Sequence, residues 1–252
     1  MYQEERQKLI LDYVMQKGKV STKELSEMFE TSVVTIRSDL SLLAQNNLLV
    51  KTHGGAIINS YRVNDIIPSD VKFQKNVEEK KKVALIAKRY LRNGDVVIID
   101  SGSTTLELAK IIDNEDLTVF TNDLQVGIEL AKKPNVKMNI SGGELIKSVY
   151  TLAGYETVEY FSKLTVDKLF LSCDALDLTF GISNRDKREI PIKKAMINAS
   201  RERILMLDHT KLDSRVLEQV AELDAVDCVI VDKIDNQLAI KIEEMGIEVI
   251  SE

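Results

Sequence analysis

The sequence predicts an α/β protein with a small N-terminal domain and a larger C-terminal domain built on a parallel sheet. Two observations support this. In the first 58 residues, three short helical patterns precede a hairpin pattern with glycines at its tip. From Val77 onward, near-continuous apolar strands alternate with helices, which is typical of a parallel sheet covered on both faces. We expect domains at residues 1–58 and 77–252, joined by a linker at 59–76, which lacks clear periodicity.

The composition is that of a globular protein. Of 252 residues, 44% are hydrophobic and 29% are charged, and no apolar run approaches the roughly 18 residues of a membrane span. The polar start carries no signal-peptide core, so we expect a cytoplasmic protein. Cys173 and Cys228 lack metal-ligand spacing and are expected to be buried, reduced thiols. His53 and His209 stand alone, so we expect no metal site and no cofactor.

Three helices are predicted in the N-terminal domain. The first spans residues 3–16 and ends at Gly18, and Ser21 with Glu24 forms a capping box at the start of the second. Ser32 can cap the third, which runs from Val33 to about Gln45.

On the third helix, the pattern places four apolar residues inward and leaves four polar residues near its exposed N-terminal part. The inward residues are Val34, Ile36, Leu40 and Leu43, and the polar ones are Thr35, Arg37, Ser38 and Asp39. Residues 48–58 then read as two strands around His53-Gly54-Gly55.

Three helices and a hairpin describe a winged helix-turn-helix, with a generic helical bundle as the alternative. The third helix would lie in the major groove of DNA, and Lys51 and His53 would touch the flanking backbone or minor groove. The residues expected to contact DNA are Ser32, Val33, Thr35, Arg37, Ser38, Lys51, His53 and Gly54.

Charge alone does not favour DNA binding. The net charge is -6, and residues 1–58 hold equal numbers of basic and acidic residues. A neutral DNA-binding domain should hold one half-site weakly, and linked domains would raise avidity by about 10²–10⁴. We therefore expect a homo-oligomer, a dimer or tetramer joined mainly through the C-terminal domain.

The C-terminal domain begins with a helical stripe around Val83 to Leu91. Strands are predicted at 95–100, 117–121, 136–140, 167–172, 203–207, 228–232 and 247–250, and further helices at 104–112, 123–132, 156–163, 189–200 and 236–245.

Polar loops follow four of these strands, at the sheet edge where ligands of parallel sheets bind. The loop 100–105 combines small hydroxyl residues and a glycine with a helix start, which suits a phosphate, and Lys211 can supply a cation. No Walker A or GxGxxG loop is present, so a nucleotide is not indicated. The alternative is ordinary helix caps and turns. Candidate effector-binding residues are Asp100, Ser101, Gly102, Ser103, Thr104, Thr105, Thr121, Asn122, Asp123, Gly142, Gly143, Asp174 and Lys211.

The sequence resembles the DeoR family of bacterial transcriptional regulators over nearly its whole length. The resemblance rests on Thr35-Ile36-Arg37-Ser38-Asp39-Leu40 and His53-Gly54-Gly55-Ala56 in the first domain, and in the second on the segments 100–105, 121–124, 142–143, 193–197 and 208–211. It implies a regulator of a sugar-catabolism operon, usually a repressor, released by a phosphorylated sugar or polyol.

Two positions depart from the family pattern. Ser38 replaces a second arginine in the third helix, so Arg37 would carry more of the DNA binding, and His209 replaces a serine near the expected effector site.

The second domain also looks like ribose-5-phosphate isomerase. Asp174 and Asp177 resemble the pair of aspartates in that enzyme. The lysine- and glycine-rich loop of that enzyme is replaced by Phe180-Gly181-Ile182-Ser183-Asn184-Arg185, which favours binding without turnover. A phosphosugar isomerase with an accessory DNA-binding domain, and an N-terminal domain that mediates only protein contacts, are the competing interpretations.

Overall fold

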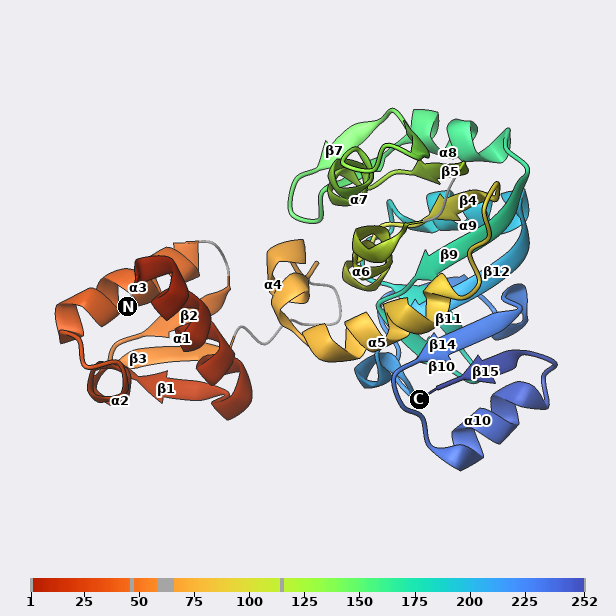
Figure 1. Ribbon diagram of the computed structural model, residues 1–252. Coiled ribbons are helices and arrows are strands. Elements are labelled where there is room, and N and C mark those ends of the chain that lie inside the picture. The colour runs from red at the N-terminus through yellow and green to blue at the C-terminus, as the bar shows by residue number, and fades with distance from the viewer. Residues whose placement is uncertain (1, 46–47, 59–65, 114–115, 252) are drawn as a thin grey trace. The chain divides into compact units, whose positions relative to one another are not determined.

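The computed structural model describes residues 2–45, 48–58, 66–113 and 116–251. The chain forms two compact units, Met1–Arg62 and Val63–Glu252. Figure 1 shows the elements of each unit.

The described residues of the N-terminal unit form three helices and a three-stranded antiparallel sheet. The helices α1 (Gln3–Lys17), α2 (Thr22–Met28) and α3 (Val33–Gln45) confirm the three predicted ones. The hairpin strands β2 (Leu49–Thr52) and β3 (Gly55–Ile58) are also as predicted. A further strand, β1 (Lys19–Ser21), was not predicted and pairs with β3. The wing is therefore a three-stranded sheet in the order β1-β3-β2.

Both predicted helix caps are present. The Ser21 hydroxyl accepts the Glu24 N–H at 3.0 Å, and the Glu24 carboxylate accepts the Ser21 N–H at 3.4 Å, so the capping box is complete. At α3, the Ser32 hydroxyl accepts the Thr35 N–H at 3.1 Å. These bonds satisfy backbone donors that have no partner within the helix.

Two residues of α3 lie on the opposite face from the one expected. Val34, expected inward, is 74% exposed, and Asp39, expected outward, is 1% exposed. Ile36 and Leu40 set the buried face, and Val34 precedes Ile36 by two residues, about 200° around a helix of 3.6 residues per turn. Asp39 lies close to that buried face because it immediately precedes Leu40, and it is buried with ionic and amide partners from α1.

The C-terminal unit is built on a seven-stranded, fully parallel sheet in the order β15-β14-β12-β9-β4-β5-β6. The strands confirm the predicted ones. They are β4 (Val96–Ile99), β5 (Leu117–Thr121), β6 (Val136–Ile140), β9 (Val166–Ser172), β12 (Ser200–Leu207), β14 (Cys228–Val231) and β15 (Glu248–Ile250).

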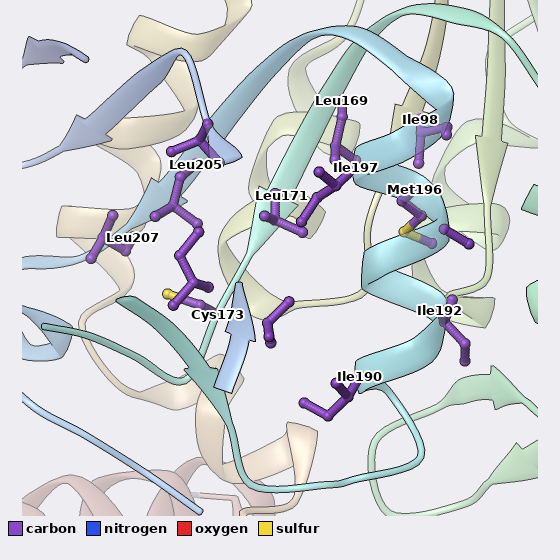
Figure 2. Packing of buried hydrophobic residues seen from close by; sticks show 14 of the residues in the cluster. Ile98, Leu169, Leu171, Cys173, Ile190, Ile192, Met196, Ile197, Leu205 and Leu207 are labelled. Carbon is purple, nitrogen blue, oxygen red and sulfur yellow. The ribbon is translucent and has the colours of Figure 1, made fainter. Parts of the chain in front are cut away.

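Helices cover both faces of this sheet, because successive residues of a strand point to opposite sides. Leu169 and Leu171 of β9 pack with α8 (Tyr155–Ser162) and α9 (Ile190–Ala199), whereas Phe170 packs with α5 (Val77–Lys88), α6 (Ser103–Ile111) and α7 (Leu124–Leu130). Figure 2 shows Ile192 and Met196 of α9 in the first of these cores. The last helix is α10 (Asn236–Glu243).

The expected linker at 59–76 needs correction. Residues 59–65 lie outside the described residues, but residues 66–76 belong to the C-terminal unit and include a helix, α4 (Ser69–Gln74). Six residues are too few to show helical periodicity in the sequence.

Short strands that were not predicted complete the unit. They form the hairpin of β7 (Glu144–Ile146) and β8 (Thr151–Ala153), and a small sheet of β10 (Ala175–Asp177), β11 (Gly181–Asn184) and β13 (Glu218–Ala221). Among the described residues, no helix is long and apolar enough to cross a membrane.

Candidate DNA-binding surface and effector site

The predicted DNA-contacting residues in α3 and just before it are at least partly exposed. Ser32, Arg37 and Ser38 are exposed, and Val33 and Thr35 are half-buried. Val34, which the apolar pattern predicts to be in the core, adds an exposed apolar side chain. The surface therefore offers a guanidinium, hydroxyls and an aliphatic group, which are the groups that read base edges and thymine methyls.

The wing is tied to the helices by polar contacts. The Lys51 ammonium of β2 donates to the Ser41 hydroxyl at 2.6 Å, and that hydroxyl donates to the Arg37 carbonyl at 2.6 Å. At the exposed tip, the Gly54 carbonyl accepts the Thr22 N–H at 2.8 Å. Gly55 faces the backbone of β1, where a Cβ would lie 1.9 Å from the Val20 carbonyl oxygen, so only glycine fits there.

In the C-terminal unit, a polar cavity lies at the carboxyl ends of β4, β9 and β12, which are neighbours in the sheet. Five predicted effector-binding residues line this cavity: Ser101, Gly102, Ser103, Asp174 and Lys211. Sequence segments that are far apart therefore converge on one place, as expected for the edge of a parallel sheet.

The wall formed by α6 is suited to an anion. Gly102 is its N-cap and makes no side-chain cap, so the first backbone N–H groups of the helix are not capped by that residue. The adjacent hydroxyls of Ser101 and Ser103 line the same wall. The partial positive charge of a helix N-terminus favours a phosphate or carboxylate.

Two lysines bring positive charge to the cavity. The Lys211 ammonium donates to the Cys173 carbonyl at 2.7 Å, which uses one of its three N–H bonds. The Lys72 ammonium of α4 lies 2.7 Å from an Asp174 carboxylate oxygen. Lys72 and Lys211 hold the pKa of Asp174 well below its usual range, so this carboxylate stays ionised.

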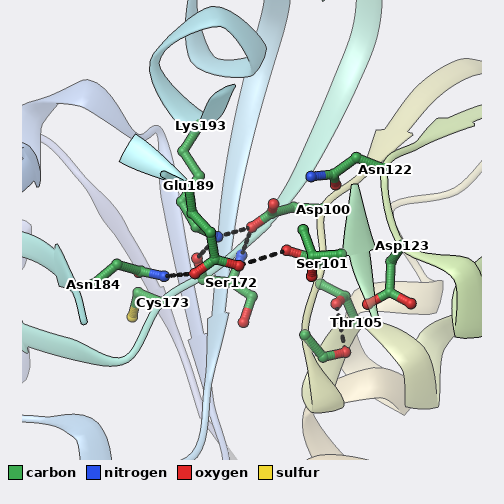
Figure 3. A network of polar contacts seen from close by, with 12 residues as sticks. Asp100, Ser101, Thr105, Asn122, Asp123, Ser172, Cys173, Asn184, Glu189 and Lys193 are labelled. Atoms are coloured by element: carbon green, nitrogen blue, oxygen red, sulfur yellow. Dashed lines mark hydrogen bonds and ion pairs between the residues drawn. The ribbon is translucent and has the colours of Figure 1, made fainter. Parts of the chain in front are cut away.

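A buried polar network lies behind the cavity (Figure 3). The Lys193 ammonium of α9 donates to Asp100 at 2.5 Å and to the Ser172 carbonyl at 3.0 Å. Glu189 accepts from the Asn184 amide at 2.9 Å and from the Ser101 hydroxyl at 3.3 Å. Burial raises the pKa of Glu189 and so favours its protonated form. The network fixes the ends of β4 and β9 relative to α9.

The remaining predicted effector residues support the cavity and do not line it. Asp123 caps α7 by accepting the Gln125 and Val126 N–H groups at 2.7 and 3.1 Å, and burial raises its pKa to about 7. The Asn122 amide donates to the Leu152 carbonyl at 3.1 Å. The Gly142 carbonyl accepts the Thr157 hydroxyl at 2.7 Å. Asp100, Thr104, Thr105, Thr121 and Gly143 are likewise absent from the lining.

Several lining residues were missed from the sequence: Ser69, Lys72, Val149, Thr151, Ser172, Cys173, Asn184 and Glu189. Lys72 and Ser69 fall in the segment interpreted as a linker, so no pattern pointed to them. Lys193, behind the lining, had a signal, because it is a lysine among the apolar residues of the predicted helix 189–200.

The two aspartates that suggested an isomerase are not brought together. Asp174 lines the cavity, whereas Asp177 lies 2.9 Å from Arg215 and accepts N–H bonds from Thr179 and Phe180 in a turn. Asp177 does not line the cavity. The acid–base pair expected for sugar isomerisation is therefore not assembled at this site.

The structure also locates the two predicted thiols and His209, which stands where the family pattern has a serine. Cys173 and Cys228 are buried and free, and burial raises their pKa values to about 11 and about 12. The Nδ1 atom of His209 lies 2.8 Å from a carboxylate oxygen of Asp232, and His209 lines a separate pocket. Among the described residues, no group of three or more His, Cys, Asp or Glu side chains could hold a metal ion.

A winged helix-turn-helix followed by a parallel-sheet domain with an anion-adapted cavity defines a DNA-binding regulator with its own sensor domain. The chain belongs to the DeoR family of transcriptional regulators. Residues 6–62 match the DeoR-like helix-turn-helix domain, and residues 75–233 match the DeoR C-terminal sensor domain.

Named relatives support the family. The chain is 33% identical to the HTH-type transcriptional repressor GlcR of Bacillus subtilis over 94% of this chain and 91% of that protein. It is 32% identical to the glycerol-3-phosphate regulon repressor of Escherichia coli over 92% of each chain. Both relatives are named as repressors.

Among solved structures, ribose 5-phosphate isomerase A from Methanocaldococcus jannaschii resembles the chain with a TM-score of 0.40 and 16% identity, over 55% of each chain.

Proposed function

We propose that this protein is a repressor of a sugar or polyol catabolic operon and that a phosphorylated sugar or polyol releases it from its operator. The observation that carries the proposal is the cavity lined both by Ser101, Gly102 and Ser103 at the start of α6 and by Lys72 and Lys211. The names of two relatives, a repressor of a glycerol-3-phosphate regulon and the repressor GlcR, agree with it.

For DNA recognition, α3 enters the major groove and presents Arg37, Thr35 and Ser38 to base edges and phosphates. Val34 is exposed beside them and provides an apolar contact for a thymine methyl. Lys51, His53 and Gly54 place the wing against the flanking backbone.

For effector recognition, the phosphate binds the Ser101–Ser103 loop at the start of α6, with Lys211 as a cation. Asp174 and Asn184 are placed to bind sugar hydroxyls, since carboxylate and amide groups accept or donate hydrogen bonds to them.

The operator complex contains more than one copy of the chain. The DNA-binding unit has few cations, so a single copy gains little from phosphate contacts, and avidity has to supply the rest. Light scattering of the pure protein tests this, and a monomer that binds operator tightly at physiological salt would contradict it.

A thermal-shift comparison of sn-glycerol 3-phosphate, glucose 6-phosphate and ribose 5-phosphate with their unphosphorylated parents tests the effector class. We expect at least one phosphate to raise the Tm, its parent to have no effect, and Lys211→Met to abolish the shift. Lys233→Met, which removes an exposed lysine elsewhere on the unit, is the matched control. A shift by a parent sugar without any shift by the phosphates would overturn the phosphate site.

A further inference from the structure

The short helix α4 forms one wall of the effector cavity, and polar contacts at both of its ends hold it there. The Ser69 N–H donates to the Ser148 carbonyl at 2.8 Å, and its hydroxyl donates to the Val149 carbonyl at 3.1 Å. Ser69 and Lys72 both line the cavity. The other walls come from the sheet edge, α6 and α9, which are anchored in the hydrophobic cores. Val71 of α4 is buried and Phe73 packs against the second core, and α4 is the shortest of the three helices that contribute to the cavity.

Two lysines fasten the C-terminal half of α4. Lys72 pairs with Asp174 at 2.7 Å across the cavity. From α5, the buried ammonium of Lys80 donates to the carbonyls of Lys72 and Lys75 at 2.5 and 2.6 Å, and so caps the end of the helix. Lys80 itself does not line the cavity.

The cavity is too small for a sugar phosphate in this arrangement, which we call the closed state. Its volume of about 20 Å³ holds a single water molecule. Pockets for small metabolites measure several hundred Å³, so a sugar phosphate requires one wall to move.

We propose that α4 is the moving wall and that Lys72 exchanges Asp174 for the anionic group of the effector. The exchange draws α4 away from its closed position. Because α4 is the first helix after the DNA-binding unit among the described residues, its shift alters that unit's fit to the operator. The inference rests on the proposed function. It assigns the closed, Asp174-paired state to the DNA-binding form, and the effector acts by its higher affinity for the open state.

The test needs no effector. Lys72→Met and Asp174→Asn each break the ion pair, and Lys80→Met releases the end of α4 without changing the cavity lining. Hydrogen exchange of the amides at 70–75 and fluorescence anisotropy on operator DNA are measured for each full-length variant. We expect exchange to be at least tenfold faster and operator Kd to be at least tenfold higher in all three.

Matched controls separate this effect from charge. Lys82→Met and Asp224→Asn remove exposed charges and should behave like the unmodified protein. Asp174→Asn removes a negative charge, which alone would tighten binding to DNA, so weaker binding by this variant identifies the ion pair as the cause.

Two results would overturn the inference. Unchanged exchange at 70–75 would show that these contacts do not hold α4, and faster exchange with unchanged or tighter operator binding would show that α4 is not coupled to the DNA-binding unit. Failure of the proposed function is distinguishable, because it appears as the absence of a sugar-phosphate thermal shift in the unmodified protein.

Discussion

Asp39 of α3 accepts a hydrogen bond from the Arg6 guanidinium of α1 at 2.6 Å. Its other carboxylate oxygen accepts the Gln7 amide at 3.0 Å. The contacts of Asp39 with Arg6 and Gln7 fix the orientation of α3 against α1 and so orient the exposed Arg37 and Ser38. A buried residue of the Thr35–Leu40 motif thus supports the part of α3 that we propose binds DNA.

Asp39→Ala should destabilise the N-terminal unit by about 3 kcal/mol, because the largely buried Arg6 loses its charged partner. Hydrogen exchange of the α1 and α3 amides measures this locally. Glu27→Ala breaks an exposed pair with Lys23 at 3.9 Å and should cost less than about 1 kcal/mol. Equal effects of the two substitutions would show that the Arg6 pair adds no special stability.

The same residue shows where sequence patterns stop being sufficient. The period of 3.6 placed Ile36, Leu40 and Leu43 correctly, but polarity alone put Asp39 outside and Val34 inside. The partner of Asp39 is 33 residues away on another helix, and one sequence carries no sign of that pairing. The exposure of Val34 follows from the helical period once Ile36 is taken as the inward reference.

Arg37→Ala should weaken specific operator binding by about 1–3 kcal/mol, roughly 5- to 150-fold, because the family's neighbouring arginine is replaced here by Ser38. Anisotropy with operator DNA and with a scrambled duplex measures the loss. Lys8→Ala removes an exposed positive charge of α1 and serves as the control for nonspecific electrostatic effects. If the Arg37→Ala variant binds the operator with unchanged affinity, α3 is not the recognition helix.

Asp123 should make the C-terminal unit less stable as pH rises from about 4 to 7. Its pKa is about 7 in the folded chain, where it is buried, and about 3.9 when unfolded. In this window the unfolded chain releases the proton and the folded chain keeps it, so rising pH favours unfolding, by an amount on the order of 4 kcal/mol.

Asp123→Asn keeps the cap on α7 and removes the titration. The difference in unfolding free energy between the unmodified protein and this variant, from urea titrations across pH 4–8, should therefore fall with pH and level off above 7. A difference independent of pH would show that Asp123 is ionised throughout.

Lys193→Met should destabilise the C-terminal unit by about 3–5 kcal/mol. The Lys193 side chain is 2% exposed and its partner Asp100 is 1% exposed, so the substitution leaves a buried carboxylate without its cation. Lys194→Met, at the exposed neighbouring position, should cost less than about 1 kcal/mol. Thermal unfolding of both variants makes the comparison, and a small loss in Lys193→Met would mean that Asp100 finds another partner.

The C-terminal unit was easier to predict than its site. The parallel sheet followed from apolar strands alternating with helices, and the loop 100–105 and Lys211 followed from their place after strands. The role of Lys72 in the cavity could not be predicted in the same way. Lys72 lies on a six-residue helix, and its partner Asp174 is 102 residues away in the sequence. Gly142, Gly143 and Asn122, which the sequence predicts as effector contacts, also contact neighbouring segments of the same unit.

The central claim, that an effector bound in the sensor domain controls operator binding, is tested most directly by anisotropy. The full-length protein is titrated onto the DNA upstream of its own gene at 150 mM salt, with and without the sugar phosphate that raises its Tm. We predict that the phosphate raises the operator Kd at least tenfold in the unmodified protein and leaves it unchanged in Lys211→Met. An operator Kd that stays the same while the phosphate stabilises the protein would contradict the claim.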